Sequence, residues 1–110
     1  ITAIIQENVL DRVREKLVAA EIYRITVTRV SGRGQQTSEE VYRGQRVVPE
    51  LIPKLRLDIA CNEEFVEPCI DAILEGARTD GGRVGDGKIL ITPLEDIIRI
   101  RTGERGGKAI

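Results

Sequence analysis

The residues best suited to chemistry lie near the end of the chain, in the stretch GDGKILITPLEDIIRIRTGE at residues 85–104. Its first two glycines flank an aspartate, and glycines in such a turn free backbone N–H groups to form an anion-binding nest. Lys88 follows at once, and Arg99 and Arg101 would share one face of a strand because strand side chains repeat every two residues. Three cations beside a nest suit a polyphosphate, which arginine grips with two donors. A plain hairpin turn with exposed cations is the alternative that this spacing leaves open.

Composition narrows the class of protein. The chain has 110 residues, a net charge of −1, 3% aromatic residues and no histidine. A nearly neutral domain with few rings has neither the charge nor the stacking surfaces of a nucleic-acid binder, so we expect no nucleic-acid partner. No apolar run approaches the ~20 residues of a membrane span, and the opening ITAII is too short for a signal peptide. We therefore expect no direct membrane insertion.

The cysteines and the acidic residues argue against metal and hydrolytic chemistry. Cys61 and Cys69 lack metal-ligand spacing and fall on apolar positions, so we predict reduced core residues, with a disulfide as the alternative. Reduced cysteines favour a cytoplasmic protein. A small nucleotide hydrolase is the competing enzyme class, but the sequence offers no nucleophile with a base beside it and no carboxylate cluster for metals. We predict that the protein is not an enzyme.

The elements that must position these residues follow in the order strand, helix, strand, strand, helix, strand. Alternating and β-branched runs predict five strands, at residues 1–5, 24–30, 54–61, 88–92 and 97–101. Helical spacing predicts one helix capped by Asn8 and another over Phe65–Ala77. Because of Pro68, either the second helix proper begins near Glu67 or its first turn is irregular. In the last strand, Ile98 and Ile100 would take the buried face. This order predicts a single α+β domain, a ferredoxin-like βαββαβ sandwich with both helices on one face and an extra C-terminal strand.

A long polar stretch, Ser31–Pro53, separates the second predicted strand from the third. It contains several glycines and prolines and shows no sustained period. Loops of this length without secondary structure are uncommon in compact domains and are usually functional or disordered. A tolerated surface insertion is the alternative.

The chain resembles the PII nitrogen-regulatory signal transduction proteins along nearly its whole length. The segments that carry the resemblance are ITAII, ITVTRVSGRGQQ, VYRG, LIPKLRLDI and ARTDGGRVGDGKILITPLEDIIRIRTGE. In the last of these, GDGKI followed by IRIRTGE at this separation is close to a family signature. The resemblance implies one PII-like domain over residues 1–110, a homotrimer with nucleotide sites in the clefts between subunits, a T-loop at about 35–53 and a C-terminal tail at about 102–110.

The resemblance also assigns nucleotide-binding roles position by position. ATP and ADP compete for each site in this family, and Mg²⁺ accompanies ATP. The phosphates would meet residues 85–88 of one subunit together with Arg99 and Arg101 of its neighbour. The adenine would meet Thr26 of that neighbour and also Asp58, where the family usually has glutamate. The implied nucleotide-binding positions are Thr26, Gly32, Gln35, Gln36, Asp58, Gly85, Asp86, Gly87, Lys88, Arg99 and Arg101.

An effector, 2-oxoglutarate, is the next implication of the resemblance, since it binds with Mg·ATP and reshapes the T-loop in the family. Gln36 matches the glutamine that bridges Mg²⁺ and 2-oxoglutarate, and Lys54 matches the lysine that pairs with the far carboxylate. Gln35 stands where relatives have an arginine, so one cation for the outer phosphate is missing. We therefore expect ADP to bind at least comparably to ATP. A sensor of the nucleotide alone, or of another small anion, is the alternative.

The long loop would carry the partner-binding residues Tyr42, Arg43 and Gly44. An ammonium transporter is the commonest target in the family, and Arg43 matches the loop arginine that plugs its pore. Another transporter, for instance for bicarbonate, or a metabolic enzyme is the alternative partner. Val47 stands at the position of the tyrosine that relatives uridylylate, so we expect no uridylylation.

Overall fold

A computed structural model describes residues 1–34, 41–42, 45–46 and 50–110 of the chain. Its two helices are α1 (Leu10–Ala19) and α2 (Val66–Ala77). The strands within the described ranges are β1 (Thr2–Ile5), β2 (Thr26–Gly32), β3 (Val41–Tyr42), β4 (Gln45–Arg46), β5 (Ile52–Asp58) and β6 (Gly87–Leu90). Three short 3₁₀ turns complete the description, at Glu7–Val9, Glu63–Phe65 and Gly106–Ala109.

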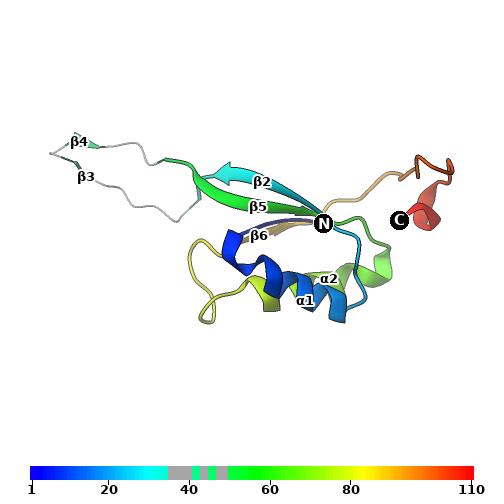
Figure 1. Cartoon of the computed structure of the whole chain (residues 1–110), viewed down its shortest axis with the longest axis horizontal. Coiled ribbons are helices and arrows are strands. Elements are labelled where there is room, and N and C mark those ends of the chain that lie inside the picture. The colour runs from blue at the N-terminus through cyan, green and yellow to red at the C-terminus, as the bar shows by residue number, and fades with distance from the viewer. Residues whose placement is uncertain (35–40, 43–44, 47–49) are drawn as a thin grey trace.

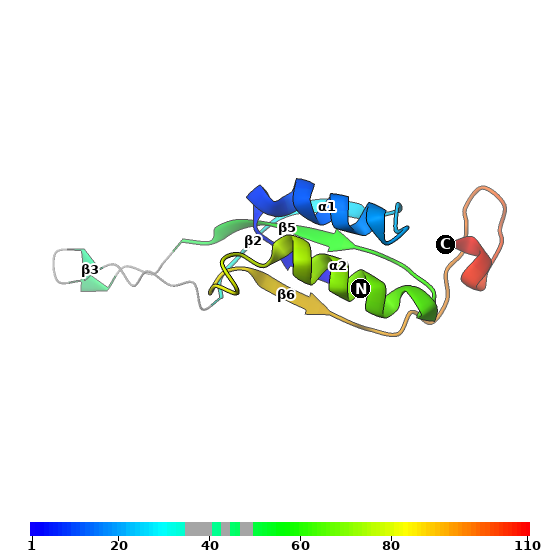
Figure 2. The ribbon, with the colours of Figure 1, turned by 90° about the horizontal axis from the view of Figure 1, so that it is seen from below.

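The main sheet has four strands in the order β2-β5-β1-β6, and every neighbouring pair is antiparallel. Both helices lie against one face of this sheet, as Figures 1 and 2 show. This order and this one-sided helix layer are the predicted ferredoxin-like arrangement, which is confirmed. The strands β3 and β4 pair only with each other and form a separate two-residue hairpin.

The core is aliphatic and lies between the sheet and the helices. The strand residues Ala3 and Leu57 are register partners, and both are fully buried. The two helices pack so closely that a Cβ added at Gly76 would lie 2.6 Å from the Val13 Cα atom. Both cysteines are free thiols, as predicted; Cys69 is buried in the core, and Cys61 is half-buried against it. The buried hydrophobic residues are Ala3, Ile5, Val9, Val13, Leu17, Ile22, Leu55, Leu57, Ile59, Cys69, Ala72, Ile73, Ala77 and Ala109.

The start of α1 differs from the prediction, and the start of α2 agrees with it. Asn8 lies inside the 3₁₀ turn that precedes α1, and no side chain caps that turn or the helix, so the predicted cap is wrong. The helix α2 begins at Val66, next to Glu67, after a 3₁₀ turn, so the predicted start near Glu67 is confirmed and Pro68 is its third residue. Proline is tolerated there because the first backbone N–H groups of a helix have no partner within the helix.

The predicted fifth strand at 97–101 does not form within this chain. Only an isolated bridge joins Ile98 to Arg105, and a 3₁₀ turn follows. The predicted burial of this segment is also wrong, because Ile98 is 53% exposed and Ile100 is 100% exposed. A strand needs a neighbour for its backbone groups, and the chain leaves the sheet after β6 and runs away from it (Figure 1).

Candidate functional site

The glycine turn (Gly85–Lys88) leads directly into β6 and is held close to β1. Gly85 has φ 100° and Gly87 has φ 112°, a backbone region that other residues rarely adopt. A Cβ added at Gly87 would lie 1.8 Å from the Ile4 carbonyl oxygen, so no other residue fits there. The predicted turn therefore exists, and its shape depends on glycine.

The Asp86 carboxylate points into the loop that precedes the turn. Its Oδ1 atom accepts hydrogen bonds from the Gln6 Nε2 atom, at 2.9 Å, and from the Thr79 hydroxyl. Its Oδ2 atom accepts from the backbone N–H groups of Thr79, at 3.0 Å, and Arg83, at 2.8 Å. The backbone N–H and the hydroxyl of Thr79, followed by the Arg83 N–H, lower the pKa of Asp86 to about 2.

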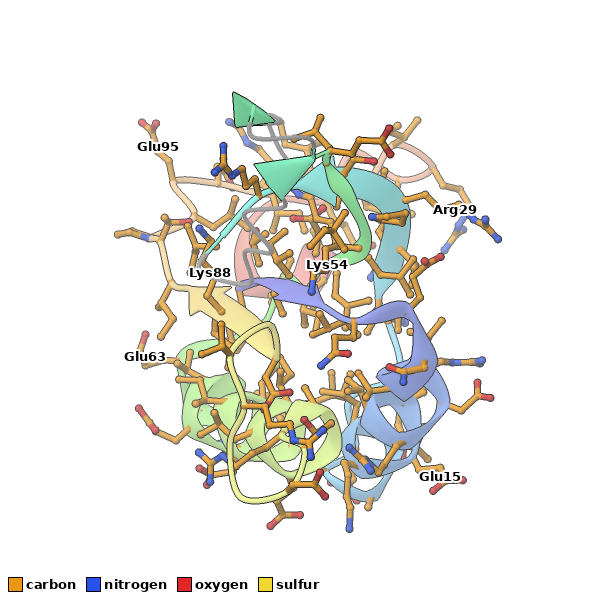
Figure 3. The ribbon with its side chains drawn as sticks, turned by 90° about the vertical axis from the view of Figure 1, so that its left-hand side faces the viewer. Glu15, Arg29, Lys54, Glu63, Lys88 and Glu95 are labelled. Carbon is orange, nitrogen blue, oxygen red and sulfur yellow. The ribbon has the colours of Figure 1, made fainter. Side chains whose placement is uncertain are left out.

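Two lysines lie at this end of the sheet. The Nζ atom of Lys54, near the start of β5, donates to the Gly85 carbonyl oxygen at 2.8 Å, so the base of the long loop is tied to the glycine turn. Lys88 is exposed, and its ammonium makes no hydrogen bond or ion pair with any described residue. Figure 3, viewed from this end, shows both lysines in the sheet layer, on the opposite side from Glu15 of α1. A cation and a positive-φ backbone turn are thus available together.

The open face of the sheet brings the two predicted adenine residues into register. Thr26 of β2 and Thr2 of β1 both lie opposite Asp58 of β5. Asp58 accepts a hydrogen bond from the Thr2 hydroxyl at 2.8 Å and pairs with the Arg56 Nε atom at 3.1 Å. These two contacts, that from Arg56 first, lower the pKa of Asp58. Asp58 and Lys54 are on the same face, roughly 13 Å apart at the strand rise of about 3.3 Å per residue.

The segment that contains the predicted arginines, residues 97–105, lies at the other end of the molecule from the glycine turn (Figures 1 and 2). The Arg99 guanidinium contacts the Glu104 carboxylate at 3.4 Å and the Lys108 carbonyl at 3.1 Å. Arg101 is exposed and has no polar partner in the described part of the chain. One chain therefore does not bring these arginines to Lys88.

Comparison with known proteins identifies the family that shares these features. The family model described as nitrogen regulatory protein P-II matches residues 1–104. The nitrogen regulatory protein P-II of Azospirillum brasilense is 46% identical over 111 residues, which is 100% of this chain and 97% of that protein. The nitrogen regulatory protein GlnK1 of Methanosarcina mazei is 45% identical, over 100% of this chain and 95% of that protein. This chain belongs to the PII (P-II) family.

Membership in the PII family confirms the resemblance read from GDGKI and IRIRTGE, and it places the protein in a family of nitrogen-regulatory signalling proteins. The P-II 1 protein of Methanothermobacter thermautotrophicus is 47% identical, again over 100% of this chain and 95% of that protein. These three relatives match the whole of this chain, and the family model matches residues 1–104, so both include the long loop.

The long loop carries several of the predicted PII site residues. Gly32 ends β2 opposite Ile52, at the base of the loop, with open space around it. Tyr42 belongs to the β3–β4 hairpin. Five predicted positions lie outside the described residues: Gln35, Gln36, Arg43, Gly44 and Val47. Among the residues that the structure does describe, no group of three or more acidic, cysteine or histidine side chains is placed to hold a metal.

Sequence reasoning missed the residues that hold the turn of this PII protein in place. Thr79 and Gln6 both donate to Asp86, and neither was singled out. Thr79 lies only seven residues before Asp86, so a local turn pattern could have pointed to it. Gln6 lies 80 residues away in the sequence, and no sequence signal joins the two.

In the described ranges, no helix combines the length and the apolar character needed to cross a bilayer.

Proposed function

We propose that this PII protein is a regulator that binds ADP and ATP between the subunits of a homotrimer and reports the bound nucleotide to a partner through its long loop. The observation that carries the proposal is the glycine turn with Lys88 beside it. Backbone N–H groups of a positive-φ turn and an exposed ammonium with no partner among the described residues are suited to phosphate oxygens. Lys54 links this turn to β5 at the base of the long loop, which gives the nucleotide a route to the loop.

A trimer would complete the site. The arginine segment, defined here as residues 96–105, lies too far from the turn of its own chain, so Arg99 and Arg101 act on a neighbouring subunit, together with Thr26. The exposed apolar side chains support this assembly, because exposed apolar patches mark interaction surfaces. In the C-terminal part of the chain these are Leu90, Ile91, Leu94, Ile98 and Ile100. A closed ring of identical subunits covers such surfaces and supplies each site from two chains.

The effector site lies beside the nucleotide in this proposal. Mg·ATP and Gln36 hold one end of 2-oxoglutarate, and hard Mg²⁺ prefers oxygen ligands. The Lys54 ammonium, which donates to the Gly85 carbonyl in this structure, pairs with the far carboxylate when the effector binds. With Gln35 in place of a cation, ADP binds at least comparably to ATP.

The output passes through the loop residues Tyr42, Arg43 and Gly44. The partner is an ammonium transporter, with a bicarbonate or other transporter or a metabolic enzyme as the alternative target. A sensor of nucleotide alone is the second form of the same function. A pull-down with and without ATP and 2-oxoglutarate separates these cases by which ligand releases the partner.

The direct test is calorimetric titration of ADP into the wild-type protein and into Lys88→Ala. We expect wild-type binding, and a loss of about tenfold in affinity for the variant, because a charge-assisted hydrogen bond contributes about 1.5–3 kcal/mol. Lys16→Ala is the matched control, since Lys16 is a half-exposed cation on α1. Equal affinities for wild type and Lys88→Ala would contradict the assignment. Single-turnover ATP assays separate a regulator, which leaves the nucleotide intact, from a hydrolase.

A further inference from the structure

The Asp86 carboxylate has every acceptor site filled by the protein itself. An ionised carboxylate offers about four lone-pair sites, two on each oxygen. The Gln6 amide and the Thr79 hydroxyl occupy Oδ1, and the backbone N–H groups of Thr79 and Arg83 occupy Oδ2. A ligand or a metal ion could reach this carboxylate only by displacing one of these donors.

The electrostatic consequence is favourable for an anion site. A bare carboxylate beside a polyphosphate would repel it, but four donors spread and offset the charge of Asp86. The same donors keep the carboxylate ionised across the physiological range, since its pKa lies at about 2. The negative charge therefore faces into the protein, and the cation of Lys88 is left to face outward.

The loop before the turn needs such a tether. Asp80 has φ 47°, Gly81 has φ 78° and Gly82 has φ 117°, so the segment has three consecutive residues in the left-handed region. Glycine-rich backbone has high conformational entropy, and ordering it requires contacts. Asp86 supplies them, because it joins the two ends of this loop to each other through Thr79.

The fourth donor fixes the loop to the sheet. Gln6 follows directly after Ile5, the last residue of β1, and Ile5 is the register partner of Gly87. The Gln6 side chain therefore holds Asp86 next to the end of β1, where the turn leads into β6. The loop is tied at both ends and to β1, close to the Ile4 carbonyl that excludes any side chain at Gly87.

We infer that Gln6, Thr79 and Asp86 form a clasp that positions the backbone of the glycine turn for phosphate binding, and that Asp86 acts as a positioning residue and not as a ligand of nucleotide or metal. The inference rests on the proposed nucleotide function. It gives the Asp86 side chain a role different from the one that sequence resemblance implies, and it adds Thr79 and Gln6 to the residues on which affinity depends.

The test compares variants that keep shape but remove one contact. Asp86→Asn replaces one acceptor oxygen by an amide donor. Thr79→Val replaces the hydroxyl by a methyl group, whereas Thr79→Ser keeps the hydroxyl. We expect Asp86→Asn to weaken ADP about tenfold and Thr79→Val about threefold, with Thr79→Ser close to wild type, because a lost hydrogen bond to a charged group misplaces the turn. Asp80→Asn, at an exposed acid of the same loop, is the control and should change affinity less than twofold.

Metal dependence separates positioning from ligation. The titrations are run with ADP in EDTA and with ATP and Mg²⁺. A clasp predicts the same fold-loss for Asp86→Asn in both, and a melting temperature that falls in Thr79→Val and stays close to wild type in Thr79→Ser. A loss confined to Mg·ATP would make Asp86 a metal ligand and overturn the inference, as would wild-type affinity in both Asp86→Asn and Thr79→Val.

A readout without nucleotide keeps this inference distinct from the proposed function. The backbone N–H groups of Thr79 and Arg83 donate to Asp86, so hydrogen exchange of these amides should speed up in Asp86→Asn. If wild-type protein binds no ADP, the proposed function fails, while faster exchange still supports the clasp. If hydrogen exchange at both amides were unchanged in Asp86→Asn, the inference that these contacts form a clasp would be contradicted.

Discussion

The glycine turn and the arginine segment are both suited to bind phosphate, but they differ in how many contacts hold them to the rest of the chain. The turn is tied to β1, β5 and the end of α2 through Gln6, Lys54 and Thr79. The arginine segment contacts mainly itself and the residues after it, and Ile100 within it is fully exposed. This difference is what the proposed intersubunit site requires, because one half is fixed within a chain and the other half is exposed to a second chain.

The largest expected effect comes from placing a methyl group in each region. Gly87→Ala would put a Cβ 1.8 Å from the Ile4 carbonyl oxygen, so we expect the free energy of unfolding to fall by about 3 kcal/mol or more. The variant should also lose ADP binding. Gly103→Ala also has positive φ, at 73°, but its Cβ would have open space, so its cost should be about 1 kcal/mol. Chemical denaturation measures both. Similar losses would mean that the two regions are equally constrained.

The second effect tests whether the halves meet between chains. Arg101→Ala should weaken ADP about tenfold, because it removes a charge-assisted contact to phosphate. Mixing denatured Arg101→Ala and Lys88→Ala chains and refolding them together should restore about a quarter of the sites, since some clefts then combine two intact halves. Calorimetry gives the number of restored sites, and light scattering gives the assembly. A monomer, or no restored site, would contradict a site that is shared between two chains.

A smaller effect is expected for the effector that Lys54 would hold. Titration of 2-oxoglutarate should show modest binding with Mg·ATP and none with ADP or without nucleotide, because the metal completes its site. Lys54→Ala should remove that binding. It should also loosen the tie to Gly85, which exchange of the turn amides would report. Binding without nucleotide would contradict the mechanism, and no binding under any condition would leave a sensor of nucleotide alone.

The smallest expected effect is the acid response of the turn. The pKa of Asp86 lies at about 2, below its ordinary value of 3.8, so its carboxylate contributes stability that is fully present above pH 4 and is lost as pH falls through about 2. Asp86→Asn should therefore flatten the acid limb of the stability curve. Asp71→Asn, at an exposed position on α2, controls for the loss of one charge. If the stability of Asp86→Asn fell as steeply at low pH as that of wild type, Asp86 would not be the cause of the acid response.

Much of the fold could be predicted because its signals are local. The alternation of Leu55 and Leu57 with charged residues predicted the inward face of β5, and both are buried, as is Ile59 directly after the strand. Helical spacing gave α1 and α2, and the order of elements gave the ferredoxin-like sheet. The fifth strand failed because strand formation depends on a neighbour, and the described part of this chain supplies none beyond the bridge at Ile98.

The candidate site divides in the same way. The sequence by itself determined the glycine turn, because positive φ at Gly85 and Gly87 is a property of the residue type. Only the tertiary structure decided that Asp86 faces inward and that Gln6, 80 residues away, reaches it. It also decided that the arginine segment lies at the far end of the molecule from the turn (Figure 2). Hydrogen-bond partners and distances between separated segments depend on how the chain packs, and the spacing of residues along the sequence does not encode them.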